Sequence, residues 1–312
     1  MEENTRRKII KATGLAIAAA VLYAMSSPFS KILLDDISPT MMASLLYLGA
    51  GMGLLITAFI RKMTGKRSNE IPLDRSDLPF TIAMIVLDII APILLMTGLM
   101  VTSAATTSLL NNFEIVATTV IALAIFKEHV SPLLWTAIVF VTLSSIILTV
   151  DDLSGFVLSP GALLVLGACV CWGLENNCTR KLSQKDPIQI TTVKGLFSGF
   201  GALIVALLIG SEFPSLVILI ITLILGFLSY GLSITSYIRA QRDLGASRVS
   251  AYYSLAPFIG VGMSIAVLGE QLDGTFIVAL VMMLLGTSLV TIDAMKAETS
   301  NPADMNRSEP SR

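Results

Sequence analysis

The sequence predicts an all-α membrane protein whose ten transmembrane helices form two inverted five-helix repeats, with both termini in the cytoplasm. Composition, the placement of basic residues and an internal repeat support this fold class. The chain has 312 residues, of which 54% are hydrophobic and only 14% are charged, whereas a soluble protein carries roughly 25% charged residues. Its apolar residues also occur in runs close to the length of about 20 residues that a helix needs to cross a bilayer.

The apolar runs define the expected helices. The ten predicted spans are residues 13–34, 39–60, 79–101, 103–126, 132–150, 160–180, 188–209, 214–237, 247–268 and 274–293. Several breaks contain proline, which is tolerated at a helix start and awkward inside one. The first run is too long for a cleaved signal peptide, so we interpret it as a span. Residues 297–312 are polar, and we expect a disordered cytoplasmic tail there.

The basic residues set the expected orientation. Nineteen of the 21 Lys and Arg residues lie at the N-terminus, after even-numbered spans or beyond the tenth span. The two exceptions are Lys31, near the end of the first span, and Lys194, inside the seventh. Because cytoplasmic loops carry an excess of Lys and Arg, we expect both termini to lie in the cytoplasm. We also expect the protein to be a multi-pass protein of the plasma (cytoplasmic) membrane.

The two halves of the chain resemble each other. A shift of 148 residues aligns Pro39 with Pro187, Gly51 with Gly199 and Gly53 with Gly201, and a shift of 142 aligns Glu128 with Glu270. We therefore predict one five-helix repeat over residues 13–150 and a second over 160–293, the second inverted because five is odd. Inverted repeats are frequent in secondary transporters, which bind substrate at the repeat interface. The compositional likeness of all membrane helices is the alternative explanation.

Two dipeptides add a family resemblance. Trp172-Gly173 lies near the start of the second repeat and Gly269-Glu270 closes its fourth span. With ten spans in two repeats, the chain resembles the EamA branch of the drug/metabolite transporter superfamily. That resemblance implies the ten-helix fold and export of amino acids or other metabolites. The first repeat departs from the pattern, with Tyr23-Ala24 and Lys127-Glu128 in place of Trp-Gly and Gly-Glu.

Three acids lie inside predicted spans, where ionisable groups are costly and usually functional. They are Asp88, Glu114 and Glu175. Glu114 belongs to a polar stripe at helical spacing, and Glu175 has the alternative of pairing with Lys194 on the next span. A proline four residues after Asp88 is expected to kink that helix. The candidate substrate- and proton-binding residues are Glu114, Asp88, Glu175, Asn111, Trp172, Tyr23, Asn176 and Tyr237.

These residues predict a secondary transporter that works by alternating access, and the family resemblance implies that it is an exporter. A low-dielectric cavity disfavours a charged carboxyl, so a proton and a cationic group compete for Glu114, and binding one releases the other. Organic cations and amino acids are the expected substrates, with aromatic rings adding cation–π contacts. The alternative is an uncoupled carrier of neutral or zwitterionic metabolites whose acids are structural; a receptor without transport is more distant.

Other functional classes lack their residues. The chain has no phosphate-binding P-loop motif and no intramembrane protease motif, so we expect it not to be an enzyme. Its single histidine, His129, falls in a loop, and we expect no metal site and no cofactor. The expected partners are a small-molecule substrate, protons and the lipid bilayer, with no nucleic acid. Since one chain carries both repeats, we expect a monomer.

Overall fold

The computed structural model describes residues 2–64, 71–127, 130–152, 157–182 and 184–300. Within these ranges the predicted all-α fold is confirmed, with ten helical stretches long and apolar enough to cross a membrane. Glu128 and His129 lie outside the described residues, as does the predicted tail from residue 301 onward. The last helix extends to Ser300 and so includes the first residues of that tail.

The elements follow in chain order. They are α1 (Glu2–Ala24), α2 (Ser26–Leu33), α3 (Pro39–Met63), a 3-10 turn (Arg75–Asp77), α4 (Leu78–Val101), α5 (Ala104–Leu110), α6 (Phe113–Phe126), α7 (Pro132–Thr149), β1 (Val150–Asp152), β2 (Val157–Leu158), α8 (Pro160–Lys181), α9 (Pro187–Leu208), α10 (Leu216–Gly226), a π-helical segment (Phe227–Leu232), α11 (Ser233–Leu244), α12 (Ala246–Tyr253), α13 (Ala256–Leu268) and α14 (Gly274–Ser300). The short antiparallel β1–β2 hairpin was not predicted.

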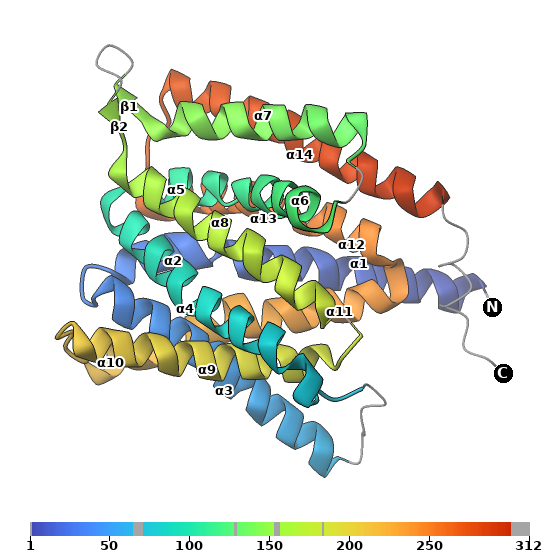
Figure 1. Ribbon diagram of the computed structural model, residues 1–312, viewed down its shortest axis with the longest axis horizontal. Coiled ribbons are helices and arrows are strands. Elements are labelled where there is room, and N and C mark those ends of the chain that lie inside the picture. The colour runs from blue at the N-terminus through green and yellow to red at the C-terminus, as the bar shows by residue number, and fades with distance from the viewer. Residues whose placement is uncertain (1, 65–70, 128–129, 153–156, 183, 301–312) are drawn as a thin grey trace.

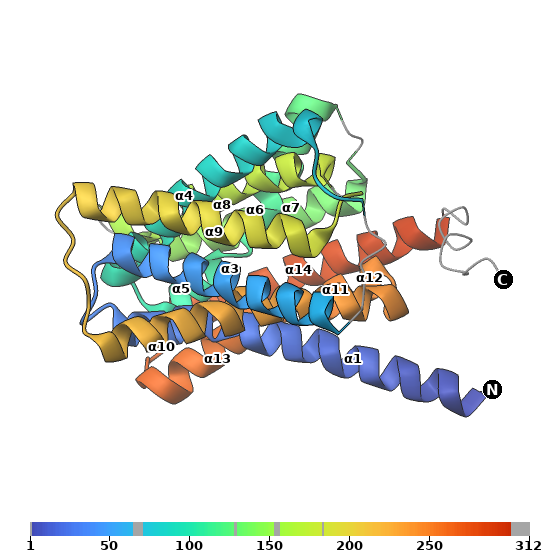
Figure 2. The same cartoon turned by 90° about the horizontal axis from the view of Figure 1, so that it is seen from below.

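The helices run roughly side by side in one bundle. Helices α7 and α14 pack together at one edge, and α3, α9 and α10 lie at the other (Figure 1). The start of α1 and the end of α14 lie at the same end of the bundle in both views, opposite the β1–β2 hairpin (Figures 1 and 2). We call these the N-terminal end and the hairpin end. Outward faces carry exposed apolar side chains such as Ile220, Ile221 and Ile224 on α10, as lipid contact requires.

Local sequence explains where the helices begin. Helices α3, α7, α8 and α9 start on a proline, whose missing N–H is not needed at that position. The preceding side chains of Ser131, Ser159 and Asp186 accept hydrogen bonds from the first-turn N–H groups. These caps satisfy backbone donors that lipid does not, so the predicted breaks become defined helix starts.

Four spans are interrupted rather than continuous, which the sequence did not predict. The first is divided at Met25, the fourth at Asn111-Asn112 and the ninth at Ser254-Leu255. The eighth contains the π-helical segment between α10 and α11. The predicted kink at Pro92 does not divide its helix, because α4 continues through this proline. Irregular backbone at membrane depth is tolerated where it lines a cavity, so the breaks direct attention to the space they surround.

Glycines allow α3 to approach its neighbours closely. Gly51 and Gly195 meet at the contact between α3 and α9, where a Cβ on Gly195 would lie 2.6 Å from the Gly51 nitrogen. On the other side of α3, a Cβ on Gly49 would lie 2.1 Å from the carbonyl oxygen of Leu223 in α10. Small residues at such sites let helix backbones pack in the absence of a hydrophobic driving force in lipid.

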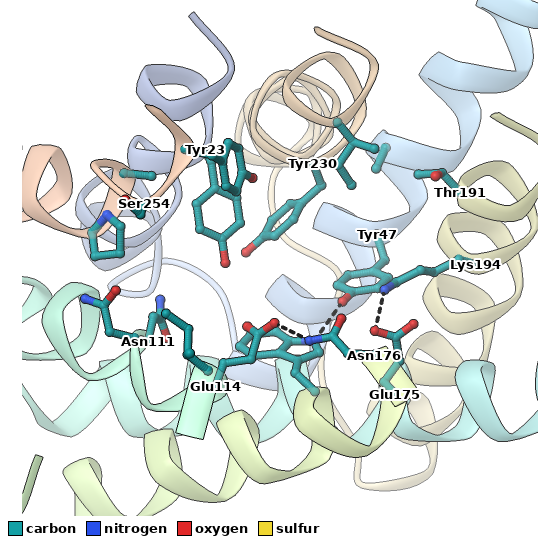
Figure 3. Close-up of a pocket in the computed structure, with 18 of the residues that line it drawn as sticks. Tyr23, Tyr47, Asn111, Glu114, Glu175, Asn176, Thr191, Lys194, Tyr230 and Ser254 are labelled. Carbon is teal, nitrogen blue, oxygen red and sulfur yellow. Dashed lines mark hydrogen bonds and ion pairs between the residues drawn. The ribbon is translucent and has the colours of Figure 1, made fainter. Parts of the chain in front are cut away.

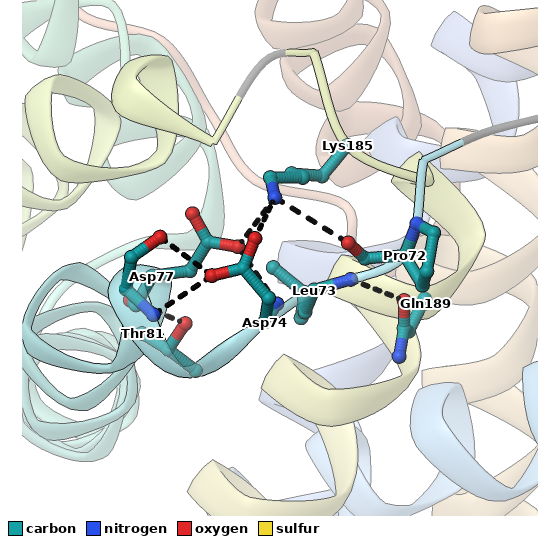
Figure 4. Close-up of polar contacts among 8 residues, drawn as sticks. Pro72, Leu73, Asp74, Asp77, Thr81, Lys185 and Gln189 are labelled. Carbon is teal, nitrogen blue, oxygen red and sulfur yellow. Dashed lines mark hydrogen bonds and ion pairs between the residues drawn. The ribbon is translucent and has the colours of Figure 1, made fainter.

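A polar junction joins two loops at the N-terminal end (Figure 4). The Lys185 ammonium lies 2.7 Å from Asp74 Oδ2 and 2.9 Å from Asp77 Oδ2. The same junction contains a hydrogen bond of 2.9 Å from the Leu73 N–H to Gln189 Oε1. Hydrogen bonds from Lys185 and from Ser76 hold the pKa of the Asp74 carboxyl well below its usual range. The ion pair of Asp74 with Lys185 therefore persists at neutral pH, and the junction connects the starts of α4 and α9.

The glycine contact provides a stability test. Replacing Gly49 with Ala forces α3 and α10 apart, because the new methyl group meets backbone rather than a flexible side chain. We expect a loss of about 1–3 kcal/mol of stability, the usual cost of overpacking. The matched control is Gly262→Ala on α13, where nothing lies within 4 Å of the added Cβ. Thermal unfolding in detergent measures both variants, and equal melting temperatures would contradict the packing argument.

Candidate functional site

The interrupted spans surround a cavity of about 340 Å³ near the middle of the bundle. Six of the eight predicted site residues line it: Tyr23, Asn111, Glu114, Trp172, Glu175 and Asn176. The cavity walls also include Tyr47, Asn112, Thr191, Lys194, Tyr230 and Tyr253, which the sequence analysis did not place in the site. These residues come from both halves of the chain, so the cavity lies between them (Figure 3).

Glu114 lies in the first turn of α6, directly after the break at Asn111-Asn112. Asn176 Nδ2 donates to Glu114 Oε1 at 2.6 Å and also contacts Thr118 Oγ1 at 3.2 Å. Among the described residues, Glu114 has no ion-pair partner. Its carboxylate faces the cavity with one neutral hydrogen-bond donor (Figure 3). A half-buried carboxylate in this state is stabilised by a proton or a cation that enters the cavity.

The other two acids share one lysine. Lys194 Nζ lies 3.0 Å from Asp88 Oδ2 and 3.1 Å from Glu175 Oε2. The pairing of Glu175 with Lys194 that the sequence allowed is therefore present. Tyr47 Oη donates to Asp88 Oδ1 at 3.0 Å, and Trp172 Nε1 donates to Tyr47 Oη at 3.4 Å. This network compensates both carboxylates and keeps Lys194 from serving a negatively charged ligand.

The charges around the cavity do not balance. Within the described chain, three carboxyl groups (Asp88, Glu114 and Glu175) surround one ammonium, that of Lys194. If all four groups are ionised, the cluster carries an excess negative charge in a largely dry region. Since Lys194 is already shared by Asp88 and Glu175, Glu114 is the group left without a cation. The arrangement favours a positively charged ligand or a proton at Glu114.

Four tyrosines, whose rings lie next to one another, form a further part of the cavity wall. The Tyr23 ring lies 5.9 Å from the Tyr230 ring and 5.4 Å from the Tyr253 ring, and Tyr47 lies 5.7 Å from Tyr230. The hydroxyl groups of Tyr23 and Tyr230 point toward the space above Glu114 (Figure 3). Aromatic faces beside an uncompensated carboxylate suit an organic cation, which gains both ionic and cation–π contacts.

Two predicted site residues do not line the cavity. Asp88 is fully buried behind the wall, because its carboxylate is occupied by Lys194 and Tyr47. Tyr237 lies on α11, where its hydroxyl bonds Ser250 at 2.9 Å and its ring packs 5.1 Å from Tyr253. Asp88 therefore contacts Lys194 from behind the cavity wall, and the predicted binding role of Tyr237 stays a prediction, since Tyr237 is not part of the lining of this cavity.

The cavity-lining residues that were not predicted differ in how well the sequence signals them. Lys194 was visible as a lone base inside a span, and it was assigned only to Glu175. The tyrosines Tyr47, Tyr230 and Tyr253 fall on three separate spans with no common spacing. Aromatic residues in membrane helices are common, so nothing in the chain order marks these three as neighbours. The helix breaks that bring them together are also a tertiary feature.

The fold and the cavity define a multi-pass membrane transporter, and comparison with known proteins identifies its family. The profile of the EamA-like transporter family matches residues 10–150 and again residues 159–292. The chain is 30% identical over 272 residues to an uncharacterized transporter of Methanothermobacter thermautotrophicus (strain Delta H), covering 81% of this chain and 78% of that protein. The chain therefore belongs to the EamA-like transporter family of the drug/metabolite transporter superfamily, a family of transporters and not of enzymes.

A solved crystal structure supports the fold. It superposes with a TM-score of 0.65 over 93% of this chain and 99% of the other, at 15% sequence identity. At that identity the likeness concerns the arrangement of helices alone. The two family matches each cover five of the ten spans in the described chain, so the protein consists of two repeats of one unit.

The shared lysine provides a second test. Lys194→Met leaves Asp88 and Glu175 without their cation, and uncompensated buried charges of this kind cost about 3–5 kcal/mol. We expect a large drop in melting temperature in detergent. Neutralising both acids in the same chain, as Lys194→Met with Asp88→Asn and Glu175→Gln, should restore most of the loss. A triple variant as unstable as the single one would show that lysine packing matters, and not charge.

Proposed function

We propose that this transporter is a proton-coupled secondary carrier that exports small organic cations, amines above all, by alternating access. The observation that carries the proposal is the uncompensated carboxylate of Glu114 in a cavity walled by tyrosines. A proton neutralises Glu114, and so does a bound ammonium group, but the two do not bind together. Exchange of one for the other is the basic step of proton–substrate antiport.

The charge arrangement supports cations over zwitterions. A zwitterionic amino acid needs a positive group for its carboxylate, and the cavity's lysine is already bound by Asp88 and Glu175. Binding the carboxylate there requires displacing an internal acid into low-dielectric surroundings, which is costly. Binding of a cation at Glu114 does not require an internal acid to leave Lys194. An uncoupled carrier of neutral or zwitterionic metabolites remains the competing hypothesis that the experiment below addresses.

The proposed orientation follows from the basic residues. We place the N-terminal end in the cytoplasm of a plasma membrane, because in the sequence 19 of the 21 Lys and Arg residues fall at the N-terminus, after even-numbered spans or beyond the tenth span. With five spans each, the two repeats have opposite orientations, which is the usual design of such carriers. Residues of both repeats line the cavity, so one chain completes the site and we propose a monomer.

The proposal predicts a specific dependence of binding on charge and pH. We expect 2-phenylethylamine to bind the purified protein and its neutral isostere 2-phenylethanol to bind poorly. Because each amine displaces one proton, affinity should rise by about tenfold per pH unit while Glu114 is mostly protonated, and level off above that range. Isothermal titration calorimetry between pH 5.5 and 8.5 measures both effects.

Two variants test whether the charge of Glu114 is responsible for amine binding. Glu114→Gln removes the exchangeable charge and should abolish amine binding and its pH dependence. Glu212→Gln, at an exposed position in the described chain, is the matched control and should bind as the wild type does. Amine-driven proton movement in proteoliposomes then tests coupling. Equal binding of amine and alcohol, unchanged in Glu114→Gln, would favour the uncoupled carrier with a structural Glu114.

A further inference from the structure

The boundary between α4 and α5 at the hairpin end is held by a lysine from another span. Helix α4 ends at Val101, so its last carbonyl groups have no partner within the helix. Lys31 Nζ, from α2, donates to the carbonyl oxygens of Leu99 at 2.7 Å, Met100 at 3.0 Å and Thr102 at 2.8 Å. One side chain thus satisfies three carbonyls at the negative end of the helix dipole.

A glutamate holds the other side of the same boundary. Helix α5 begins at Ala104, and its first N–H groups also need partners. Glu270 Oε1 accepts from the Ala104 N–H at 2.7 Å and Oε2 accepts from the Ala105 N–H at 2.8 Å. Glu270 comes from the loop between α13 and α14, in the second repeat. Lys31 and Glu270 therefore connect the ends of four spans at one point.

Buried hydroxyl groups lie on two of the helices that meet at this point. Helices α2, α5 and α13 pack against one another, and we call the contact region between these three helices the seam. Ser30 Oγ on α2, and Thr107 Oγ1 and Ser108 Oγ on α5, are buried and have no hydrogen-bond partner among the described residues; Asn111 Oδ1 is in the same state. Buried polar atoms are normally paired. Groups that are unpaired in a closed seam gain partners when water or a polar ligand enters it.

The seam starts at the main cavity. A small cavity of about 10 Å³, roughly the space of one water molecule, is lined by Ser26, Ser27, Ser108 and Asn111 among others. Tyr23 and Tyr230 line this cavity and the main one, as do Asn111, Ala256 and Pro257, so the two cavities adjoin. The Tyr230 hydroxyl is bonded to Ser26 Oγ at 2.7 Å. Tyr23 and Tyr230 therefore lie where the seam meets the main cavity.

The three helices of the seam end at helix breaks beside the main cavity. Helix α2 follows the break at Met25, α5 precedes the break at Asn111-Asn112, and α13 follows the break at Ser254-Leu255. A short helical segment joined at such a break reorients relative to its neighbour when the backbone dihedral angles of a few residues at the break change. The seam is closely packed in this state, since a Cβ on Gly260 of α13 would lie 2.8 Å from Ser108 Oγ.

We propose that this seam is the route from the main cavity to the hairpin side of the membrane, and that Lys31 and Glu270 are the lock that keeps it closed. The proposal rests on the alternating access stated above and not on the identity of the substrate. Opening separates α2 and α13 from α5, releases the helix ends from Lys31 and Glu270, and exposes the seam hydroxyls to water. Lys31 and Glu270 are positioning residues, since neither lines the main cavity.

A cysteine inside the seam tests the proposal. In a chain whose three native cysteines are replaced by alanine, Ser108→Cys places a thiol where no hydrogen bond is lost. We expect slow reaction with a membrane-impermeant methanethiosulfonate added from the hairpin side. Adding Glu270→Gln should accelerate it about tenfold, the effect of losing one charge-assisted hydrogen bond from the closed state. Gly260→Ala should act in the same direction by wedging the seam without changing charge.

Two controls separate opening of the seam from general loosening. Ser144→Cys is buried on α7, where the native hydroxyl bonds Ala279 and not the seam, and its reactivity should not change with Glu270→Gln. Reagent added from the N-terminal side should not show the acceleration at position 108. Unchanged labelling at 108 in both Glu270→Gln and Gly260→Ala, or equal acceleration at 108 and 144, overturns the proposal. Amine binding in the same preparations reports on the proposed function separately.

Discussion

The structure depends on one constraint, which is that backbone polar groups inside a bilayer need partners within the protein. Ten spans of the described chain meet it as helices, with prolines and capping side chains at the starts of several of them. Three of the four interruptions lie at Met25, Asn111-Asn112 and Ser254-Leu255, and all four lie beside the main cavity. At the break between α4 and α5 at the hairpin end, Lys31 and Glu270 pair with the backbone groups of the two helix ends. Interruptions of the helices therefore coincide with the cavity and with points where side chains from other spans supply backbone partners.

The need for partners within the protein applies to the charged side chains as well. The protein places a single lysine, Lys194, between two buried acids and leaves the third acid, Glu114, with an amide donor. The first arrangement is a stable internal compensation, and the second creates a group whose free energy depends on what enters the cavity. The difference between Asp88 and Glu114 is thus one of partners, although both are acids in the middle of apolar spans. It also explains why a cationic ligand is favoured although the cavity contains a lysine.

Sequence reasoning predicted the spans well because each one is a local property. A run of about 20 apolar residues is visible without knowing its neighbours, and the observed helix starts at Pro39, Pro132, Pro160 and Pro187 lie at or next to the predicted ones. Six of the eight predicted site residues line the cavity because polar groups in apolar helices are rare. Asp88 and Tyr237 do not line it, and their contacts with Lys194 and Ser250 could not be foreseen because these partners come from other helices. Tyr47, Tyr230 and Tyr253 were missed for the same reason.

By itself, then, the sequence determined that this protein is a ten-span membrane protein with repeated halves and that acids lie within its spans, and it predicted a binding role for Glu114 among them. These features follow from hydropathy, from periodicity and from the cost of a charge in lipid, all of which act along one stretch of chain. Only the tertiary structure decided which acid keeps a cation, which rings face the cavity and which side chains close the seam. Those outcomes depend on distances between helices far apart in the sequence, such as the contact of Lys31 with the end of α4.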